Sequence, residues 1–300
     1  MTPSAPPVPV DSATVVLMRE PAPERLEILL VARHAESRAF AGAHVFPGGL
    51  LEAVDRSPAI RDAMAPHVAS DTVPATLGDD LDRDAGLAFL AATIRELFEE
   101  AGILLADRDG RLLGFGDPAV RDRFAEHRRA LVTGALDFAE LVARERLTLR
   151  ASDLRYYSRW ITPVHAPRRY DARFFVAPVP PDQTPLHDER ETTSAEWLTP
   201  AAALAGAAAG TIVLTPPTAR TLEDLVELGT MARVLETART RHVTPILPKV
   251  VQIGEHMGVL YPGDAAYDST EAGSTIPAAC EGPQNRVIMD PAGWRRLMGR

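Results

Sequence analysis

The chain has 300 residues, which is enough for one large domain or two small ones. Its net charge of -9 argues against a protein that must neutralise many nucleic-acid phosphates. No apolar run reaches the roughly 18 residues of a membrane span, and the single cysteine, Cys280, allows no intramolecular disulfide. We therefore expect a cytoplasmic protein that binds neither nucleic acid nor a membrane, and a homodimer stays open.

The N-terminal region predicts a disordered tail followed by two strands. Residues 1–10 are rich in proline and lack the charged-then-apolar order of a signal peptide. The apolar residues at 13–18 and 26–31 predict strands joined by a turn that contains proline.

A glycine pair, Gly48 and Gly49, follows these strands and precedes a polar stretch. Residues 56–86 hold three prolines, several aspartates and little apolar periodicity. We interpret them as an insertion outside the core sheet, since the entropy of loop closure grows slowly with length.

The next element is a helix that presents carboxylates on one face. Its buried stripe repeats at helical spacing through Leu87, Leu90, Ala91, Ile94, Leu97 and Ala101. Gly102 predicts the helix end, and 103–105 predict a strand. Glu96, Glu99 and Glu100 stand at positions i, i+3 and i+4, where like charges repel unless a hard cation such as Mg²⁺ binds them. The neighbouring Arg95 is suited to hold one carboxylate through a bidentate ion pair.

These segments together resemble the signature of a Nudix hydrolase. Gly49 fits its first glycine, and Asp55 stands where glutamate is usual. The run from Arg95 to Ile103 fits the second half, Arg-Glu-U-x-Glu-Glu-x-Gly-U, where U is apolar. The 56–86 insertion separates the halves. The resemblance implies that Glu96, Glu99 and Glu100 bind Mg²⁺ or Mn²⁺, and that the Gly48-Gly49 turn approaches a substrate phosphate.

The split signature is similar to that of the peroxisomal Nudix subfamily that cleaves coenzyme A, and of its bacterial relatives. Arg33, Arg38, Gly42 and Phe46 keep the spacing of that subfamily's upstream motif, although His34 and Val31 depart from it. The resemblance implies that Arg33 and Arg38 contact substrate phosphates, which guanidinium groups bind well.

The middle of the chain predicts a helical insertion and two further strands. Residues 118–147 read as helical with a break near Gly134, and the strands are expected at 157–163 and 173–179. Arg168 is a candidate substrate-binding residue, with Arg169 and Arg173 as weaker candidates.

Acidic residues before Trp197 are candidates for the active site. In several Nudix members a carboxylate near this position acts as a metal ligand or general base, which makes Glu191 a candidate and Glu189 its rival. Trp197 and Leu198 then resemble the final Nudix strand, and an alanine-rich helix follows.

The C-terminal region changes in character. A helix is predicted from about 215 to 240, and residues 244–292 are rich in proline and glycine. We expect this tail to lack a separate core and to pack over the preceding domain.

The predicted fold class is α/β, a Nudix α/β/α sandwich with a mixed sheet. The expected organisation is a tail at 1–10, a Nudix domain at 11–209 with insertions at 56–86 and 118–147, and an extension at 210–300. The expected reaction is metal-dependent hydrolysis of coenzyme A or acyl-coenzyme A to 3′-phosphoadenosine phosphate and (acyl-)4′-phosphopantetheine, with Glu100 or Glu191 as the base.

Two alternatives stay open from the sequence. A Nudix pyrophosphatase for ADP-ribose, NADH or dinucleoside polyphosphates would carry the same carboxylates. A catalytically idle module that binds a nucleotide or a protein usually loses one of the carboxylates, and here all three are present.

Overall fold

The computed structural model describes residues 6–33, 42–68, 77, 81–185, 192–278, 281–290 and 293–297. The expectations for Arg38, Glu189 and Glu191 therefore lie outside the described residues. No helix within these ranges is long and apolar enough to cross a membrane.

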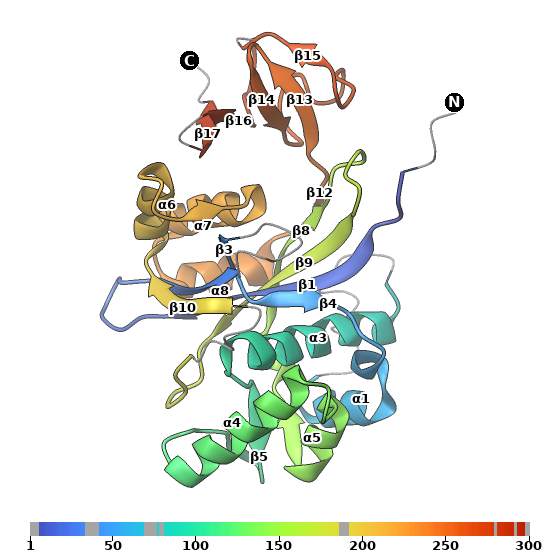
Figure 1. The fold of residues 1–300 in the computed structure, drawn as a ribbon, viewed down its shortest axis with the longest axis vertical. Coiled ribbons are helices and arrows are strands. Elements are labelled where there is room, and N and C mark those ends of the chain that lie inside the picture. Colours follow the sequence, from blue (N-terminus) through green and yellow to red (C-terminus); the bar gives the residue numbers. More distant parts are fainter. Residues whose placement is uncertain are drawn as a thin grey trace.

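A mixed sheet forms the centre of the molecule (Figure 1). Its strand order is β11-β3-β2-β1-β9-β8-β12, with β10 also paired to β2 and β4 also paired to β1. The strands are β1 (Val10–Arg19), β2 (Glu27–Arg33), β3 (Ala43–Val45), β4 (Gly48–Leu50), β8 (Arg155–Ile161), β9 (Tyr170–Pro178), β10 (Thr192–Leu198), β11 (Val213–Leu214) and β12 (Pro245–Ile246).

The position of β1 in this sheet determines where the glycine pair lies. β1 runs parallel to β9 and antiparallel to both β2 and β4. Gly49 lies opposite Ala13, and Gly48 opposite Thr14. The strand predicted at 13–18 lies within β1, and those predicted at 26–31, 157–163 and 173–179 overlap β2, β8 and β9 with ends shifted by one to three residues.

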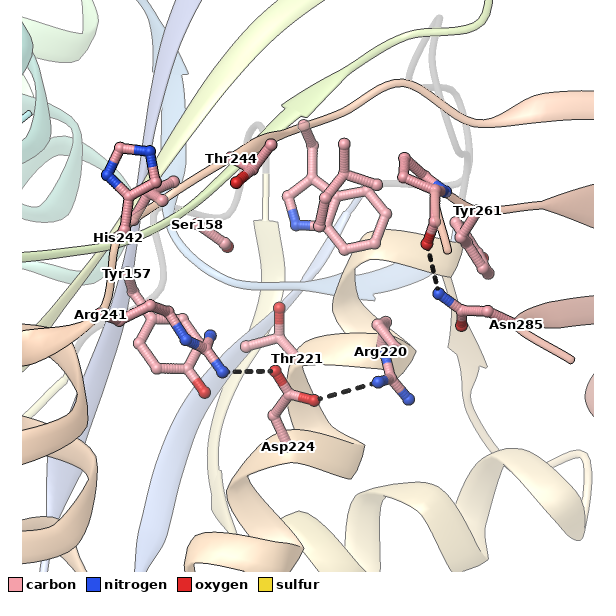
Figure 2. Close-up of a pocket in the computed structure, with 14 residues that line it drawn as sticks. Tyr157, Ser158, Arg220, Thr221, Asp224, Arg241, His242, Thr244, Tyr261 and Asn285 are labelled. Carbon is pink, nitrogen blue, oxygen red and sulfur yellow. Dashed lines mark hydrogen bonds and ion pairs between the residues drawn. The ribbon is translucent and has the colours of Figure 1, made fainter. Parts of the chain in front are cut away.

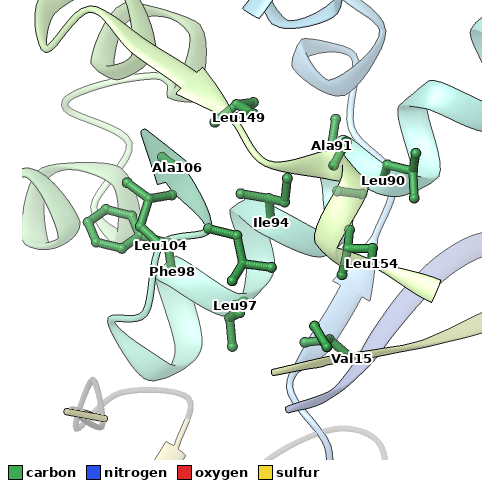
Figure 3. Packing of buried hydrophobic residues seen from close by; sticks show 14 of the residues in the cluster. Val15, Leu90, Ala91, Ile94, Leu97, Phe98, Leu104, Ala106, Leu149 and Leu154 are labelled. Atoms are coloured by element: carbon green, nitrogen blue, oxygen red, sulfur yellow. The ribbon is translucent and has the colours of Figure 1, made fainter. Parts of the chain in front are cut away.

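One face of the sheet is covered by α3 (Arg83–Ala101). Asp82 caps its first turn, and Gly102 ends it with a left-handed backbone at φ +68°. Its residues Ile94 and Leu97 are fully buried against Val15 of β1 and the adjoining apolar segments (Figure 3). This anchoring fixes the opposite, acidic side of the helix relative to β4.

Both insertions lie on this side of the molecule (Figure 1). The 118–147 segment forms α4 (Pro118–Val132) and α5 (Phe138–Arg144), as predicted. The described part of 56–86 contains no strand, as expected of a segment outside the core sheet, but it contributes buried residues to the core. It forms α1 (Pro58–Met64) and the 3₁₀ helix η2 (Ala65–His67), and buries Ile60 and Met64 in the main core. Two more 3₁₀ helices are η1 (Val54–Arg56) and η3 (Ala151–Asp153).

The opposite face of the sheet carries α6 (Pro200–Ala208), α7 (Pro216–Leu228) and α8 (Met231–Thr240). The alanine-rich helix is confirmed as α6. The single helix predicted from 215 to 240 is wrong, because Gly229 adopts φ +75° and Thr230 caps a new helix. The two helices share an apolar cluster with Phe174, Val176 and Trp160 of the sheet.

The strand predicted at 103–105 is also corrected. Those residues are buried but belong to no strand. The strand is β5 (Ala106–Arg108), which pairs with β6 (Arg111–Leu112) and β7 (Leu147–Leu149).

The C-terminal region is more regular than its composition predicts. It forms a sheet ordered β15-β13-β14-β16-β17, from β13 (Lys249–Ile253), β14 (His256–Leu260), β15 (Thr275–Ile276), β16 (Arg286–Asp290) and β17 (Gly293–Leu297). Val251, Ile253, Leu260 and Ile288 form a small cluster of its own. Val259 and Tyr261 instead join the cluster of the main sheet, so the region has a small cluster of its own and also packs on the main sheet.

Candidate active site

The glycine strand β4 lies directly against the acidic side of α3. The backbone N–H of Gly48 donates a hydrogen bond of 2.9 Å to Oε2 of Glu100. An added Cβ at Gly49 would overlap the carboxylate of Glu96, and one at Gly48 would overlap the backbone of Ala13. A side chain at Gly48 would therefore clash with the backbone, and one at Gly49 would displace the carboxylate of Glu96. The insertion therefore leaves the turn and the carboxylates together, as the split signature predicts.

Arg95 links the two halves of the signature through a buried ion pair with Asp55. Its Nε donates to Oδ1 of Asp55 at 2.9 Å, and its Nη2 donates to Oδ2 at 3.0 Å. The side chains are 2% and 0% exposed. The expected bidentate pair thus exists, but its acceptor is Asp55 rather than one of the helix carboxylates.

The remaining donors of Arg95 organise the rest of the site. Nη2 also donates to the carbonyl of Leu50 at 2.8 Å, and Nη1 donates to Glu96 at 2.8 Å and to Glu99 at 3.4 Å. Burial disfavours the charged guanidinium, but the hydrogen bond to Asp55 and the nearby carboxylates outweigh it and raise the pKa of Arg95. This arginine is therefore a permanent cation at the base of the site.

This environment shifts the pKa of Glu99. Burial raises its pKa to about 7; Arg95 opposes the shift, and Glu96, Glu52 and Asp55 reinforce it. A buried carboxylate among like charges binds an added cation well, because the cation offsets both the cost of burying the charge and the repulsion from the neighbouring carboxylates.

The helical insertion supports the same end of α3. Arg128 of α4 is buried, and its guanidinium donates to the carbonyls of Glu99 at 2.9 Å and of Glu100 at 3.0 Å. A cation near the carbonyl end of a helix interacts favourably with the helix dipole. No sequence pattern marks this contact, since the residues are 28 or 29 positions apart.

The donor set fits a hard divalent cation, although it forms no closed cage. Within the described ranges, no group of three or more His, Cys, Asp or Glu side chains is arranged to hold a metal ion by itself. Mg²⁺ usually binds through one or two carboxylates and completes its shell with water and substrate phosphates. Glu96, Glu99 and Glu100 offer oxygen ligands of this kind beside an open glycine backbone.

The other predicted site residues are placed in different ways. Arg33 lies at the end of β2, and Arg168 is exposed in the connection between β8 and β9; their substrate roles stay predictions. Arg169 donates to the carbonyls of Thr162 and Pro7. Arg173 is 2% exposed, and its guanidinium lies 4.1 Å from the ring centroid of Phe89. The last two arginines therefore serve the packing of the sheet.

Comparisons with known proteins agree with this geometry. A family model described as the NUDT19 Nudix domain matches residues 10–225. A Gallus gallus protein named acyl-coenzyme A diphosphatase NUDT19 is 29% identical over 280 residues, which cover 80% of this chain and 72% of that protein. Its Homo sapiens counterpart is 28% identical over 287 residues, which cover 83% and 74%.

A solved structure supports the fold. The crystal structure of a NUDIX hydrolase from Alicyclobacillus acidocaldarius matches with a TM-score of 0.59 at 23% sequence identity, covering 79% of this chain and 99% of that one. The family model spans most of the chain and includes β4, α3 and the ion pair that joins them. This chain is a Nudix hydrolase and belongs to the family of the NUDT19 Nudix domain.

Proposed function

We propose that this Nudix hydrolase cleaves the diphosphate bond of coenzyme A or an acyl-coenzyme A. The products would be 3′-phosphoadenosine phosphate and (acyl-)4′-phosphopantetheine. The observation that carries the proposal is the contact between the Gly48-Gly49 strand and Glu96 and Glu100, which puts half-buried glycine backbone beside a patch of carboxylates. The names of the chicken and human relatives supply the substrate class.

The residues of the chain have distinct tasks in this reaction. Glu96, Glu99 and Glu100 would hold Mg²⁺ or Mn²⁺. When bound, such a cation neutralises phosphate charge and lowers the pKa of a bound water. Asp55 and Arg95 keep the carboxylates in place, and a carboxylate, Glu100 or Glu191, takes the proton of the attacking water. Phosphoryl transfer depends mainly on such positioning and charge stabilisation.

The upstream arginines are assigned to substrate recognition. Arg33 is the last residue of β2, and Arg38 belongs to the motif shared with coenzyme A-cleaving relatives. We assign to Arg38 the 3′-phosphate, which distinguishes coenzyme A from dephospho-coenzyme A. A charge-assisted hydrogen bond of about 1.5–3 kcal/mol corresponds to roughly ten- to a hundred-fold in affinity.

A hydrolysis screen tests the proposal. Coenzyme A, dephospho-coenzyme A, ADP-ribose and NADH would each be incubated with Mg²⁺ or Mn²⁺, and the products separated by chromatography. We expect the highest kcat/KM for coenzyme A or its acyl form, and Arg38→Ala should raise KM for coenzyme A more than for the dephospho form. Faster turnover of ADP-ribose or NADH would assign the site to another Nudix substrate. Absence of turnover for all substrates would favour the idle module.

A further inference from the structure

A separate cavity of about 260 Å³ lies on the face of the central sheet opposite α3 (Figure 2). Its walls come from β8, α7, the end of α8 and the segments next to β14 and β16. Ser158 of β8 pairs with Phe174, which pairs with Thr14, which pairs with Gly48. Three strand spacings of ~4.8 Å put Ser158, in the cavity wall, about 14 Å from Gly48 within the sheet.

Aromatic side chains form the inner walls of this cavity. Tyr157, Trp160 and Tyr261 line it and are 1%, 4% and 4% exposed. Trp160 and Tyr261 meet edge to face, with ring centroids 5.8 Å apart. Such walls offer a planar ring both stacking and edge contacts.

Buried hydrogen-bond donors are left without acceptors in the same walls. Among the residues that the structure describes, neither Nε1 of Trp160 nor Oγ of Ser158 has a hydrogen-bond partner. An indole N–H can only donate, and a buried donor without an acceptor is costly. A ligand that carries hydrogen-bond acceptors would therefore satisfy donors for which the described residues supply none.

The rim of the cavity is charged. Asp224 lies between Arg220 and Arg241, at 3.5 Å from each guanidinium (Figure 2). Arg220 also forms an ion pair with Glu223, with 2.8 Å between Nη1 and Oε2. Arg241 is 35% exposed and lies over the ring of Tyr157, 4.8 Å from its centroid. Arg241 is thus the cation best placed to receive an anion from solvent.

We propose that this cavity is a second ligand site, one that binds a purine nucleoside monophosphate. The base would lie among the aromatic walls, with ring nitrogens accepting from Trp160 and Ser158, and the phosphate would meet Arg241 at the rim. In a purine nucleoside monophosphate, the base supplies a flat ring with acceptor nitrogens for the cavity walls, and the phosphate supplies a negative charge for the rim.

The volume sets the size of this ligand. Pockets for drug-sized ligands measure roughly 300–1,000 Å³, so a cavity of about 260 Å³ suits a base and its sugar with the phosphate at the mouth, and excludes a whole dinucleotide. The site lies across the sheet from the carboxylates, and its occupancy does not depend on hydrolysis.

Equilibrium titration with AMP in the presence of a metal chelator tests the proposal. We expect saturable binding at one site per chain, and a loss of about tenfold or more in affinity in both Trp160→Phe and Arg241→Gln. Trp160→Phe keeps an aromatic ring at this position and removes the indole N–H. Trp197→Phe is its matched control, because Trp197 also has a buried Nε1 without a described partner but lies outside the cavity.

The controls separate this site from the catalytic one. Glu99→Gln should abolish most hydrolysis and leave AMP binding unchanged, and ribose 5-phosphate should bind much more weakly than AMP. The proposal is overturned by absence of saturable binding up to millimolar AMP. It is also overturned if Trp160→Phe and Trp197→Phe, both folded by circular dichroism, bind AMP equally. Equal binding of ribose 5-phosphate and AMP would remove the base from the site.

Discussion

The candidate sites on the two faces of the central sheet differ in how their buried polar groups are satisfied. On the α3 face, Arg95 donates hydrogen bonds to Asp55, to the carbonyl of Leu50 and to Glu96, so the chain itself satisfies this buried cation. On the opposite face, Trp160 and Ser158 keep donors that no described residue accepts. The first arrangement is typical of a site that must hold its own shape before substrate arrives. The second is typical of a site completed by its ligand.

Breaking the ion pair should give the largest effect on the α3 face. We expect Asp55→Ala to lower the free energy of unfolding by about 3–5 kcal/mol, because it leaves the guanidinium of Arg95 buried without its main partner. Chemical denaturation in chelator measures this. Asp62→Ala, at an exposed position of α1, is the control and should stay within about 0.5 kcal/mol of the wild type. Equal effects of the two variants would contradict a self-sufficient site.

The carboxylates should matter more for turnover than for folding. Glu99→Gln or Glu100→Gln should reduce kcat by at least ~10²-fold, a loss of about 2.7 kcal/mol of transition-state stabilisation. The replacements are isosteric, so far-UV circular dichroism should be unchanged. Glu236→Gln, on the exposed side of α8, should keep full activity. Near-normal rates in both site variants would contradict the hypothesis that the carboxylates of α3 bind the catalytic metal.

The support from the insertion should be weaker but measurable. Arg128→Met removes the donors to the carbonyls of Glu99 and Glu100, which should cost about 1.5–3 kcal/mol of stability. If Arg128 positions the carboxylates, kcat should fall about tenfold with little change in KM, since the chemistry and not the binding is disturbed. Arg129→Met, at the exposed neighbouring position, is the control. A loss of stability with kcat preserved would make Arg128 a packing residue only.

The smallest effect concerns pH. The pKa of Glu99 rises from 4.5 to about 7 on folding, so the folded chain holds a proton that the unfolded chain releases earlier. Stability from this group is complete below pH 4.5 and is lost as pH rises through about 7. Without metal, Glu99→Gln should therefore be more stable than the wild type at pH 8 by about 1–2 kcal/mol, and equal to it at pH 4. Thermal melts in chelator at both pH values decide this; an equal difference at pH 4 and pH 8 would refute the shift.

The sequence was a good guide wherever the signal was local. The periodicity of α3, its glycine stop and the spacing of its carboxylates depend on residues within one helix, and the structure has them as predicted. The ion pair of Arg95 with Asp55 crosses 40 positions, and the sequence offers the nearby Glu96, Glu99 and Glu100 as acceptors instead. The burial of Ile60 and Met64 was missed because three prolines and many aspartates surround them.

The C-terminal sheet escaped prediction for a related reason. Its strands are short, and proline and glycine separate them, so neither composition nor periodicity distinguishes them from a wrapped tail. Their pairing and the ion pair of Asp264 with Arg286 are contacts between distant segments. The cavity likewise depends on β8, α7 and β14 meeting in space, which no single segment encodes.

The sharing of Val259 and Tyr261 with the cluster around Trp160 has a practical consequence. The region matched by the family model ends at residue 225, before α8 and the C-terminal sheet. A chain cut at that boundary would lose the cover of an apolar sheet face, and exposed patches of this kind promote self-association. We expect such a fragment to aggregate even though it keeps β4 and α3, so the region that the family model matches should need α8 and the C-terminal sheet to resist aggregation.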